Sequence, residues 1–293
     1  MRTMPTEKKI KTRKPSWLKK SLPKGGDYQR VRNLLSHAGL HTVCKEANCP
    51  NMFECFSKDT STFMILGSEC TRNCRFCNVT CGTPSLIDPQ EPIRVAKAAL
   101  DLNLKYIVVT SVTRDDLDDG GALHFAATIH AIKSIVPGYP KIEVLIPDFK
   151  GDMEALKKVV SAKPDVLNHN IETVSSLYPK VRPEAIYQRS LTLLQNVKTI
   201  APLMPVKSGI MVGLGETASE LEQTLTDLFC HGCDIITIGQ YLQPTKKHLP
   251  VEKYYSPEEF GILEKTAKKI GFKKIAAGPF VRSSYRAKEL SSL

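Results

Sequence analysis

Short apolar runs recur along most of this sequence, and each is followed by a stretch with helical spacing. Runs of this length suit strands that are covered on both faces. Six units of strand, loop and helix are readable, with strands expected at residues 62–66, 106–110, 142–146, 166–168, 209–212 and 235–238. In the first helical stretch, Val95, Ala98, Ala99 and Leu102 have the spacing of a buried stripe, which indicates core packing.

Two of the helix starts are marked by capping residues. Thr217 followed by Glu220 is a capping box, and Ser256, Pro257 and Glu259 combine a cap, a first-turn proline and the reciprocal acid. These signals place a helix directly after each motif.

Strands that alternate with helices pair in parallel through right-handed crossovers. Six consecutive units predict an α/β fold, a partial (β/α)6 TIM-like barrel with N-terminal and C-terminal extensions. The alternative is an open doubly wound sheet. In both folds ligands bind at the carboxyl ends of the strands, so we expect the chemistry in the loops that follow them.

The positive charge is concentrated at the N-terminus. Residues 1–25 contain nine Lys and Arg against Glu7, which accounts for +8 of the formal net charge of +11 and leaves +3 for the rest. Such a tail attracts an anionic partner through salt-screened forces, or is a solvated, disordered leader. It lacks interleaved aromatic residues and any recognised binding module, so we expect no nucleic-acid partner.

No apolar run has the length of a membrane span, and the first ten residues lack the hydrophobic stretch of a secretion signal. We therefore expect no membrane association and a cytoplasmic location. The apolar content of 42% over 293 residues is enough for one large domain. The cysteine count of nine, in a reducing compartment, favours metal ligation over disulfides.

The first candidate metal site follows the first predicted strand. Cys70, Cys74 and Cys77 have C-x3-C-x2-C spacing, with Phe76 before the last cysteine. A four-iron cluster usually takes four thiolates, so three leave one iron open for a ligand that is not protein. The alternative is zinc with Cys81 as the fourth thiolate, but structural zinc sites usually pair two knuckles that are far apart in sequence.

A second cysteine triad lies upstream, in an irregular segment. Cys44, Cys49 and Cys55 have C-x4-C-x5-C spacing and no obvious fourth partner. Two groups with local spacing favour two clusters, although one shared site of six thiols is the alternative. Cys230 and Cys233 form a C-x2-C at the end of a helical stretch, which we interpret as structural rather than as a redox pair.

Both triads, together with motifs along the chain, resemble the lipoyl synthase family of the radical S-adenosylmethionine (SAM) superfamily. The resemblance extends from about residue 13 to 286. The motifs that carry it are Arg13-Lys14-Pro15-x-Trp17-Leu18, Ser111-Val112-x-Arg114-Asp115-Asp116-Leu117, His169-Asn170-Ile171-Glu172-Thr173, residues 209–217, Gly239-Gln240-Tyr241 and Arg282-Ser283-Ser284-Tyr285. The family pattern assigns no role to Cys81, Cys230 or Cys233.

This resemblance implies a sulfur-insertion reaction at C6 and C8 of an octanoyl group on a lysine of a carrier protein. The cofactors implied are SAM and two [4Fe–4S] clusters, one on each triad. SAM binds the open iron of the Cys70–Cys74–Cys77 cluster, and the Cys44–Cys49–Cys55 cluster is the sulfur donor. The fourth ligand of the second cluster is implied to be Ser284, with Ser283 as the alternative.

The family pattern divides the chain into a basic tail (1–25), an extension for the auxiliary second cluster (26–60), the radical SAM barrel (61–277) and a C-terminal extension with the Arg-Ser-Ser-Tyr motif (278–293). The partners implied are an octanoylated glycine-cleavage H protein or 2-oxoacid dehydrogenase E2 domain, an electron donor such as flavodoxin or ferredoxin, and an iron–sulfur carrier. The alternatives are another SAM-dependent sulfur-inserting or methylthiolating enzyme, and a non-catalytic iron–sulfur scaffold or electron carrier.

Candidates for contact with SAM lie at the predicted strand ends. Carboxylates suit ribose hydroxyls, and glycines let the backbone approach a ligand closely. The candidates are Arg114, Asp115, Asn170, Glu172, Arg182, Gly213 and Gly215. The alternative is that Asp115 and Glu172 cap helices or pair with neighbouring arginines. No G-x4-G-K-[ST] phosphate loop is present, so the sequence gives no support to nucleotide hydrolysis.

Overall fold

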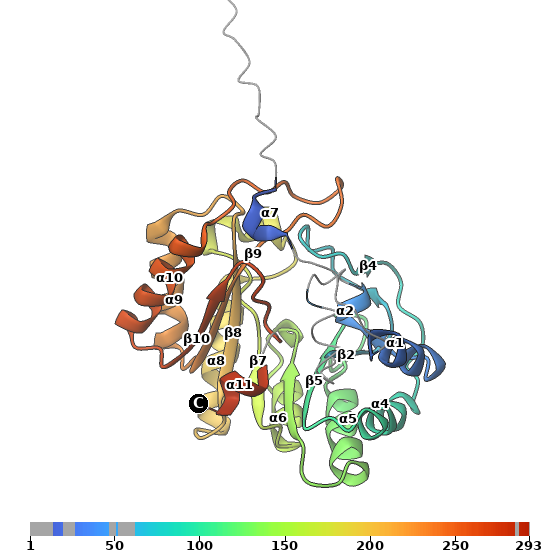
Figure 1. Cartoon of the computed structure of the whole chain (residues 1–293). Coiled ribbons are helices and arrows are strands. Elements are labelled where there is room, and N and C mark those ends of the chain that lie inside the picture. The colour runs from blue at the N-terminus through green and yellow to red at the C-terminus, as the bar shows by residue number, and fades with distance from the viewer. Residues whose placement is uncertain (1–13, 20–26, 47–50, 52–61, 285–286, 293) are drawn as a thin grey trace, which may run out of the picture.

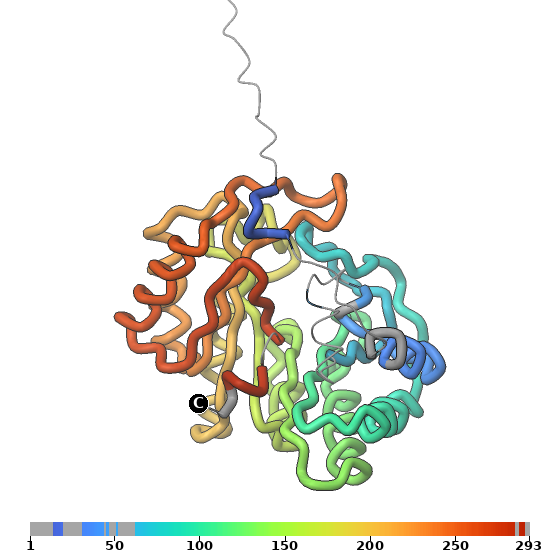
Figure 2. Tube along the Cα trace, viewed as in Figure 1, coloured from blue at the N-terminus to red at the C-terminus, as the bar shows by residue number. Residues whose placement is uncertain are grey.

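The computed structural model describes residues 14–19, 27–46, 51, 62–284 and 287–292 (Figures 1 and 2). Its centre is one curved, eight-stranded sheet with the order β1-β2-β5-β6-β7-β8-β9-β10. The strands are β1 (His41–Thr42), β2 (Thr62–Ile65), β5 (Tyr106–Ser111), β6 (Lys141–Leu145), β7 (Val166–Asn168), β8 (Val206–Val212), β9 (Ile235–Gln240) and β10 (Lys274–Gly278).

All neighbouring strands pair in parallel except β1, which is antiparallel to β2. The strands stand in sequence order, so each crossover advances in the same direction, which rules out the doubly wound alternative. Among the described residues β1 and β10 do not pair with each other. The partial barrel is confirmed, and it stays open between these two edges.

The predicted units are all present. The strands β2, β5, β6, β7, β8 and β9 are followed in turn by the helices α4 (Glu91–Asp101), α5 (Ala122–Ile135), α6 (Met153–Ser161), α8 (Tyr187–Ile200), α9 (Ala218–Cys230) and α10 (Pro257–Ile270). These helices cover the outer face of the sheet (Figure 1). Both capping boxes form as expected, at Thr217 and Ser256.

Shorter elements surround the barrel. They are η1 (Ser16–Leu18), α1 (Asp27–His37), α2 (Val43–Glu46), the two-stranded sheet of β3 (Glu69–Cys70) and β4 (Thr80–Cys81), η2 (Phe149–Gly151), η3 (Ser175–Leu177), α7 (Tyr178–Val181) and α11 (Ala287–Ser292). None of the described helices has the length and apolar character needed to cross a membrane.

The two faces of the sheet differ because strand side chains alternate. Ile107 and Val109 on β5 belong to the main core with the helices, where Val95, Ala98 and Ala99 are buried as predicted. The inward face also carries charge: Lys207 Nζ on β8 lies 2.9 Å from Glu143 Oε1 on β6, and both side chains are buried.

The strands β1 and β10 and the helix α11 are elements that the sequence pattern did not predict. Leu290 of α11 packs against Val166 and Ile235, the first residues of β7 and β9, and Ala287 packs against Tyr106, the first residue of β5. The helix α11 therefore closes the barrel at the amino ends of its strands, opposite the expected site (Figure 1).

Candidate functional site

A cavity of about 530 Å³ lies at the carboxyl ends of the barrel strands. Loops from distant parts of the chain converge on it. Among its lining residues are Cys70, Cys74, Cys77, Asn170, Glu172, Arg182, Ser283 and Ser284. The structure thus brings together residues that the sequence singled out for three different roles: cluster ligands, SAM contacts and the serine ligand.

The cysteine loop is fixed by backbone hydrogen bonds. The Thr113 amide lies 3.3 Å from Cys70 Sγ and the Arg72 amide 3.5 Å from the same sulfur, so both donate toward it. The Cys77 amide donates to the Cys74 carbonyl at 3.0 Å. The Cys77 carbonyl in turn contacts the His248 ring at 2.8 Å. The thiols are therefore presented by a loop whose backbone is held on both sides.

Burial keeps two of these thiols neutral when no metal is bound. It raises the pKa of Cys77 to about 12, and charge on Cys74 and Cys70 acts in the same direction. Burial also raises the pKa of Cys74, against the opposing charge of Arg182. Thiolate is the form that binds metal, so a metal centre at this loop releases these protons as it binds.

The positions of the described thiols bear on the zinc alternative. Among the described residues, no three His, Cys, Asp or Glu side chains stand close enough together to bind a single metal ion. Zn–S bonds of about 2.3 Å require the sulfurs of one zinc ion to crowd together. In a four-iron cluster each thiolate binds a different iron, so the sulfurs stand farther apart. The described thiols therefore do not fit the zinc alternative, and the cluster stays a prediction for this loop.

Arg182, Asn170 and Glu172 form a polar group beside the cysteine loop. Asn170 Nδ2 donates to Glu172 Oε1 at 2.9 Å, and Arg182 Nη1 donates to the Asn170 carbonyl at 3.0 Å. Asn170 Oδ1 and Arg182 Nε are buried, and within the described part of the chain neither has a hydrogen-bond partner. Buried polar atoms normally have partners, so these two are suited to contact a polar ligand.

Glu172 has a left-handed backbone, with φ of 65°. Its amide donates to the Gly209 carbonyl at 2.9 Å, and its carbonyl accepts from the Met211 amide at the same distance. Burial raises the pKa of its carboxyl, against the charge of Arg182 and a hydrogen bond from Asn170. A non-glycine residue in this region costs about 1–3 kcal/mol, and such strain concentrates at ligand sites.

His169 precedes Asn170 in the chain, and contacts at both ring nitrogens hold its side chain in place. Its Nδ1 lies 2.8 Å from the Ile146 carbonyl and its Nε2 3.0 Å from Ser190 Oγ. Burial lowers the pKa of His169 to about 4, and the charge of Arg182 acts in the same direction. The ring is therefore neutral near pH 7. Its Nδ1 carries the proton and donates to the Ile146 carbonyl, because a carbonyl oxygen can only accept a hydrogen bond.

Four of the predicted SAM contacts do not line the cavity. Arg114 pairs with Asp116 at 2.8 Å, and Asp115 pairs with Arg72 at 2.6 Å, which is the alternative considered for Asp115. A methyl group at Gly213 would lie 2.3 Å from Gln240 Nε2, so this glycine makes room for protein rather than for ligand. Gly215, with φ of 113°, needs glycine for its backbone.

The C-terminal segment reaches the cavity beside β9. A methyl group at Gly239 would lie 2.2 Å from the Val281 carbonyl oxygen, so only glycine allows this approach. Ser283 and Ser284 follow directly and line the cavity. The side chain of Cys44, and the whole of Cys49 and Cys55, lie outside the described residues, so the second triad stays a prediction.

The remaining cysteines have the positions expected of residues without a role in the site. Cys81 is exposed on β4, in register with Cys70. Cys230 is exposed, whereas Cys233 is buried with its thiol directed at the Ile235 carbonyl at 3.2 Å. Burial raises the pKa of Cys233 to about 12, which makes a redox pair with Cys230 unfavourable and agrees with the structural interpretation.

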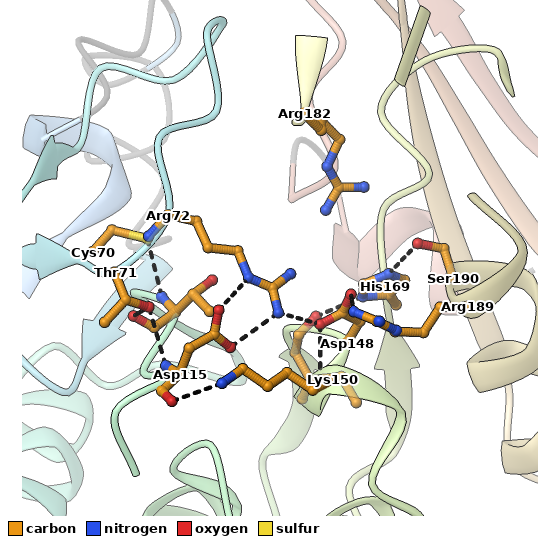
Figure 3. A network of polar contacts seen from close by, with 12 residues as sticks. Cys70, Thr71, Arg72, Asp115, Asp148, Lys150, His169, Arg182, Arg189 and Ser190 are labelled. Atoms are coloured by element: carbon orange, nitrogen blue, oxygen red, sulfur yellow. Dashed lines mark hydrogen bonds and ion pairs between the residues drawn. The ribbon is translucent and has the colours of Figure 1, made fainter. Parts of the chain in front are cut away.

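Sequence reasoning missed the buried ion pairs of Arg72, which lies between two of the cluster cysteines (Figure 3). Its side chain contacts Asp115 and also Asp148, each at 2.6 Å. Asp148 follows β6 and stands far from the cysteines in sequence. Its position after a predicted strand was the available signal, but the pairing depends on tertiary structure.

Comparisons with known proteins agree with this geometry. The Radical SAM superfamily description matches residues 64–228, and the N-terminal domain of lipoyl synthase matches residues 2–49. A lipoyl synthase of Alkaliphilus metalliredigens is 55% identical over 94% of this chain and 95% of its own length. One from Caldanaerobacter subterraneus subsp. tengcongensis is 56% identical over 94% of this chain and 96% of its own. The chain belongs to the lipoyl synthase family.

Solved structures support the fold of this lipoyl synthase family member. Methylornithine synthase aligns with a TM-score of 0.53 at 15% identity, covering 71% of this chain and 60% of that chain. The FeFe-hydrogenase maturase of Carboxydothermus hydrogenoformans aligns with a TM-score of 0.54 at 16% identity, covering 78% and 64%. At these identities the likeness concerns the barrel alone.

Proposed function

We propose that this chain is a lipoyl synthase, a sulfurtransferase that inserts sulfur at C6 and C8 of an octanoyl group on a lysine of a carrier protein. The observation that carries the proposal is one cavity, at the carboxyl ends of the strands, lined by the Cys70–Cys74–Cys77 loop and by Ser283 and Ser284. Family membership implies SAM and two [4Fe–4S] clusters as cofactors.

The residues divide between the two clusters. Cys70, Cys74 and Cys77 hold the first cluster and leave one iron for SAM, whereas Cys44, Cys49, Cys55 and Ser284 hold the auxiliary cluster. When bound, the first cluster and SAM supply the carbon-centred radical that removes hydrogen from the inert carbons, and the auxiliary cluster supplies the sulfur. The remaining work, orientation and exclusion of water, belongs to the chain itself.

Arg182, Asn170 and Glu172 are the residues we assign to SAM. SAM carries a carboxylate, an amino group and ribose hydroxyls. The unpartnered Arg182 Nε suits the carboxylate, and the unpartnered Asn170 Oδ1 and the Glu172 carboxyl suit donors such as the amino group or the hydroxyls. Burial strengthens each of these contacts, because water does not compete for them.

The chain divides, on this proposal, into a basic tail (1–25), an auxiliary-cluster extension (26–60), the barrel (61–277) and a C-terminal extension (278–293). The carrier is the octanoylated H protein of glycine cleavage or a 2-oxoacid dehydrogenase E2 domain. A flavodoxin or ferredoxin supplies electrons, and an iron–sulfur carrier rebuilds the auxiliary cluster. The enzyme works in the cytoplasm.

The experiment is anaerobic incubation of the reconstituted chain with SAM, a reductant and an octanoyl-lysine peptide, followed by mass analysis. Two sulfur insertions that depend on SAM are expected. Cleavage of SAM without any sulfur in the peptide would refute lipoyl synthase activity and leave only a radical SAM enzyme of another specificity.

A further inference from the structure

A buried arginine sits inside the loop that carries the first-cluster cysteines. Arg72 lies two residues after Cys70 and two before Cys74, and its side chain is 4% exposed. Residues of a cluster-binding loop need not be charged, and taking a guanidinium out of water is costly unless it is paired.

Two carboxylates, from the loops after two different strands, fix the Arg72 side chain (Figure 3). Its Nε donates to Asp115 Oδ2 at 2.6 Å and its Nη2 to Asp115 Oδ1 at 3.0 Å, a two-bond fork. The same Nη2 donates to Asp148 Oδ1 at 2.6 Å. Asp115 follows β5 and Asp148 follows β6, so one side chain ties the cysteine loop to two neighbouring strand ends.

The carboxylates are themselves held rigidly. Asp148 is buried, caps η2 by accepting from the Lys150 amide at 3.1 Å, and lies 3.4 Å from Arg189 Nη1. Lys150 Nζ donates to the Asp115 carbonyl at 2.9 Å. The carboxylates of Asp115 and Asp148 both contact Arg72, so its charge is paired where it stands.

The backbone beside Arg72 meets the Cys70 sulfur. The Arg72 amide lies 3.5 Å from Cys70 Sγ, and the Thr113 amide, from the loop after β5, lies 3.3 Å from it. Thr71 Oγ1 donates to the Thr113 carbonyl at 3.0 Å and accepts from the Asp115 amide at 3.0 Å. The Arg72 fork and the Thr71 hydroxyl therefore clamp the same two segments whose amides face Cys70.

We propose that Arg72 is a positioning residue of the first cluster, which holds two backbone amides on the Cys70 thiolate and thereby sets the cluster's reduction potential. The inference rests on the proposed first-cluster site. Hydrogen bonds to cluster sulfurs stabilise the more negative, reduced state, so their loss makes the potential more negative. Arg72 touches neither substrate nor cluster, and it acts through the loop.

The test compares Arg72→Lys with the parent chain as the reconstituted holoenzyme. Lysine keeps the positive charge but lacks the planar fork, so it cannot bind Asp115 through two bonds and Asp148 at the same time. The readouts are the redox midpoint and the electron paramagnetic resonance spectrum of the reduced cluster that responds to SAM. Because only a cluster with an open iron binds SAM, this response identifies the first cluster.

The expected result is a more negative midpoint, an altered spectrum and a loss of about 10- to 100-fold in SAM cleavage, the usual cost of removing a group that orients a metal ligand. The matched control is Lys207→Met, which removes an equally buried cation from β8, where Lys207 pairs with Glu143 away from the cavity lining. The control should lower thermal stability and leave the midpoint and spectrum unchanged.

A second variant guards against misfolding. Asp115→Asn keeps Arg72 and its bond to Asp148 but weakens the fork, so it should shift the midpoint in the same direction by less. If Arg72→Lys does not fold, Asp115→Asn alone decides. Parental midpoint and spectrum in a folded Arg72→Lys chain, or in Asp115→Asn where it decides alone, would overturn the proposal and leave Arg72 a purely structural ion pair.

These readouts do not depend on sulfur insertion. A chain that shows the predicted shifts but never makes dithiolated product would refute the proposed function and preserve the role of Arg72. A chain that makes product normally with an unshifted Arg72→Lys midpoint would do the reverse.

Discussion

Gly239→Ala tests whether the C-terminal segment has to lie where it does for the auxiliary cluster to work. A methyl group at this position would stand 2.2 Å from the Val281 carbonyl oxygen, whereas ordinary contact begins at 3.4 Å. The segment therefore has to retreat by about 1.2 Å, and Ser283 and Ser284 move with it. Overpacking of this kind costs about 1–3 kcal/mol of stability.

The functional loss should exceed the loss of stability. A misplacement of about 1 Å in a catalytic arrangement can reduce turnover by about 100-fold. We expect product formation to fall by that order and auxiliary-cluster iron to fall partly, while SAM cleavage at the Cys70–Cys74–Cys77 site persists. The assays are iron per chain, dithiolated peptide by mass, and 5'-deoxyadenosine release.

Gly278→Ala is the matched control, because Gly278 pairs with Gly239 in register on the neighbouring strand β10. Among the described residues, a methyl group there would meet Val281 Cγ2 alone, at an ordinary 3.5 Å. This variant should keep its iron and its product yield. Normal product from Gly239→Ala, with full iron, would refute the reasoning that places the serine ligand through this contact.

The remaining predictions concern the ligands, the tail and pH. Ser284→Cys should keep full iron and SAM cleavage but make little dithiolated product, since a fourth thiolate binds iron more firmly than an alkoxide. Normal product yield from Ser284→Ala would show that Ser284 is not the fourth ligand of the auxiliary cluster and would turn attention to Ser283. Replacing Cys70, Cys74 and Cys77 with Ala should remove about half the iron and abolish SAM cleavage. Replacing Cys44, Cys49 and Cys55 with Ala should remove as much iron and end sulfur transfer but leave SAM cleavage measurable. If each triple variant loses both activities, the two triads hold one shared cluster. Deleting residues 2–12 should slow binding of an acidic carrier at low salt and have little effect at high salt, because screening acts within about 10 Å at 0.1 M; unchanged salt dependence would make the tail a passive leader. Although burial opposes it, Arg72 lowers the pKa of Asp148 from 3.8 to about 2. The ionised carboxylate therefore stabilises the fold above pH 4 by on the order of 2 kcal/mol, and this stability is lost as pH falls through 2. Denaturant unfolding of Asp148→Asn should show a lower free energy of unfolding than the parent chain at pH 7, with a difference that shrinks below pH 4, and a difference independent of pH would contradict this prediction.

The sequence by itself determined the barrel and supplied the prediction of the first-cluster ligands. The strands and helices of the barrel could be predicted because their apolar spacing is local in the sequence. The capping boxes predicted at Thr217 and Ser256 are both present. The triad of Cys70, Cys74 and Cys77 is local as well, because one loop holds all three. The motif containing Asn170 and Glu172 placed two residues at a strand end, where barrels bind ligands.

Tertiary structure decided which strand-end residues face the cavity. Arg114 and Asp115 follow a strand just as Asn170 and Glu172 do, but Arg114 pairs with Asp116, and Asp115 is taken up by Arg72. The strand β10 and the helix α11 were also missed, since β10 is a half-exposed edge and α11 derives its stability from packing of Leu290 against the barrel base. Periodicity reports which face of an element is buried, whereas ion pairs and edge contacts depend on neighbours brought together only by folding.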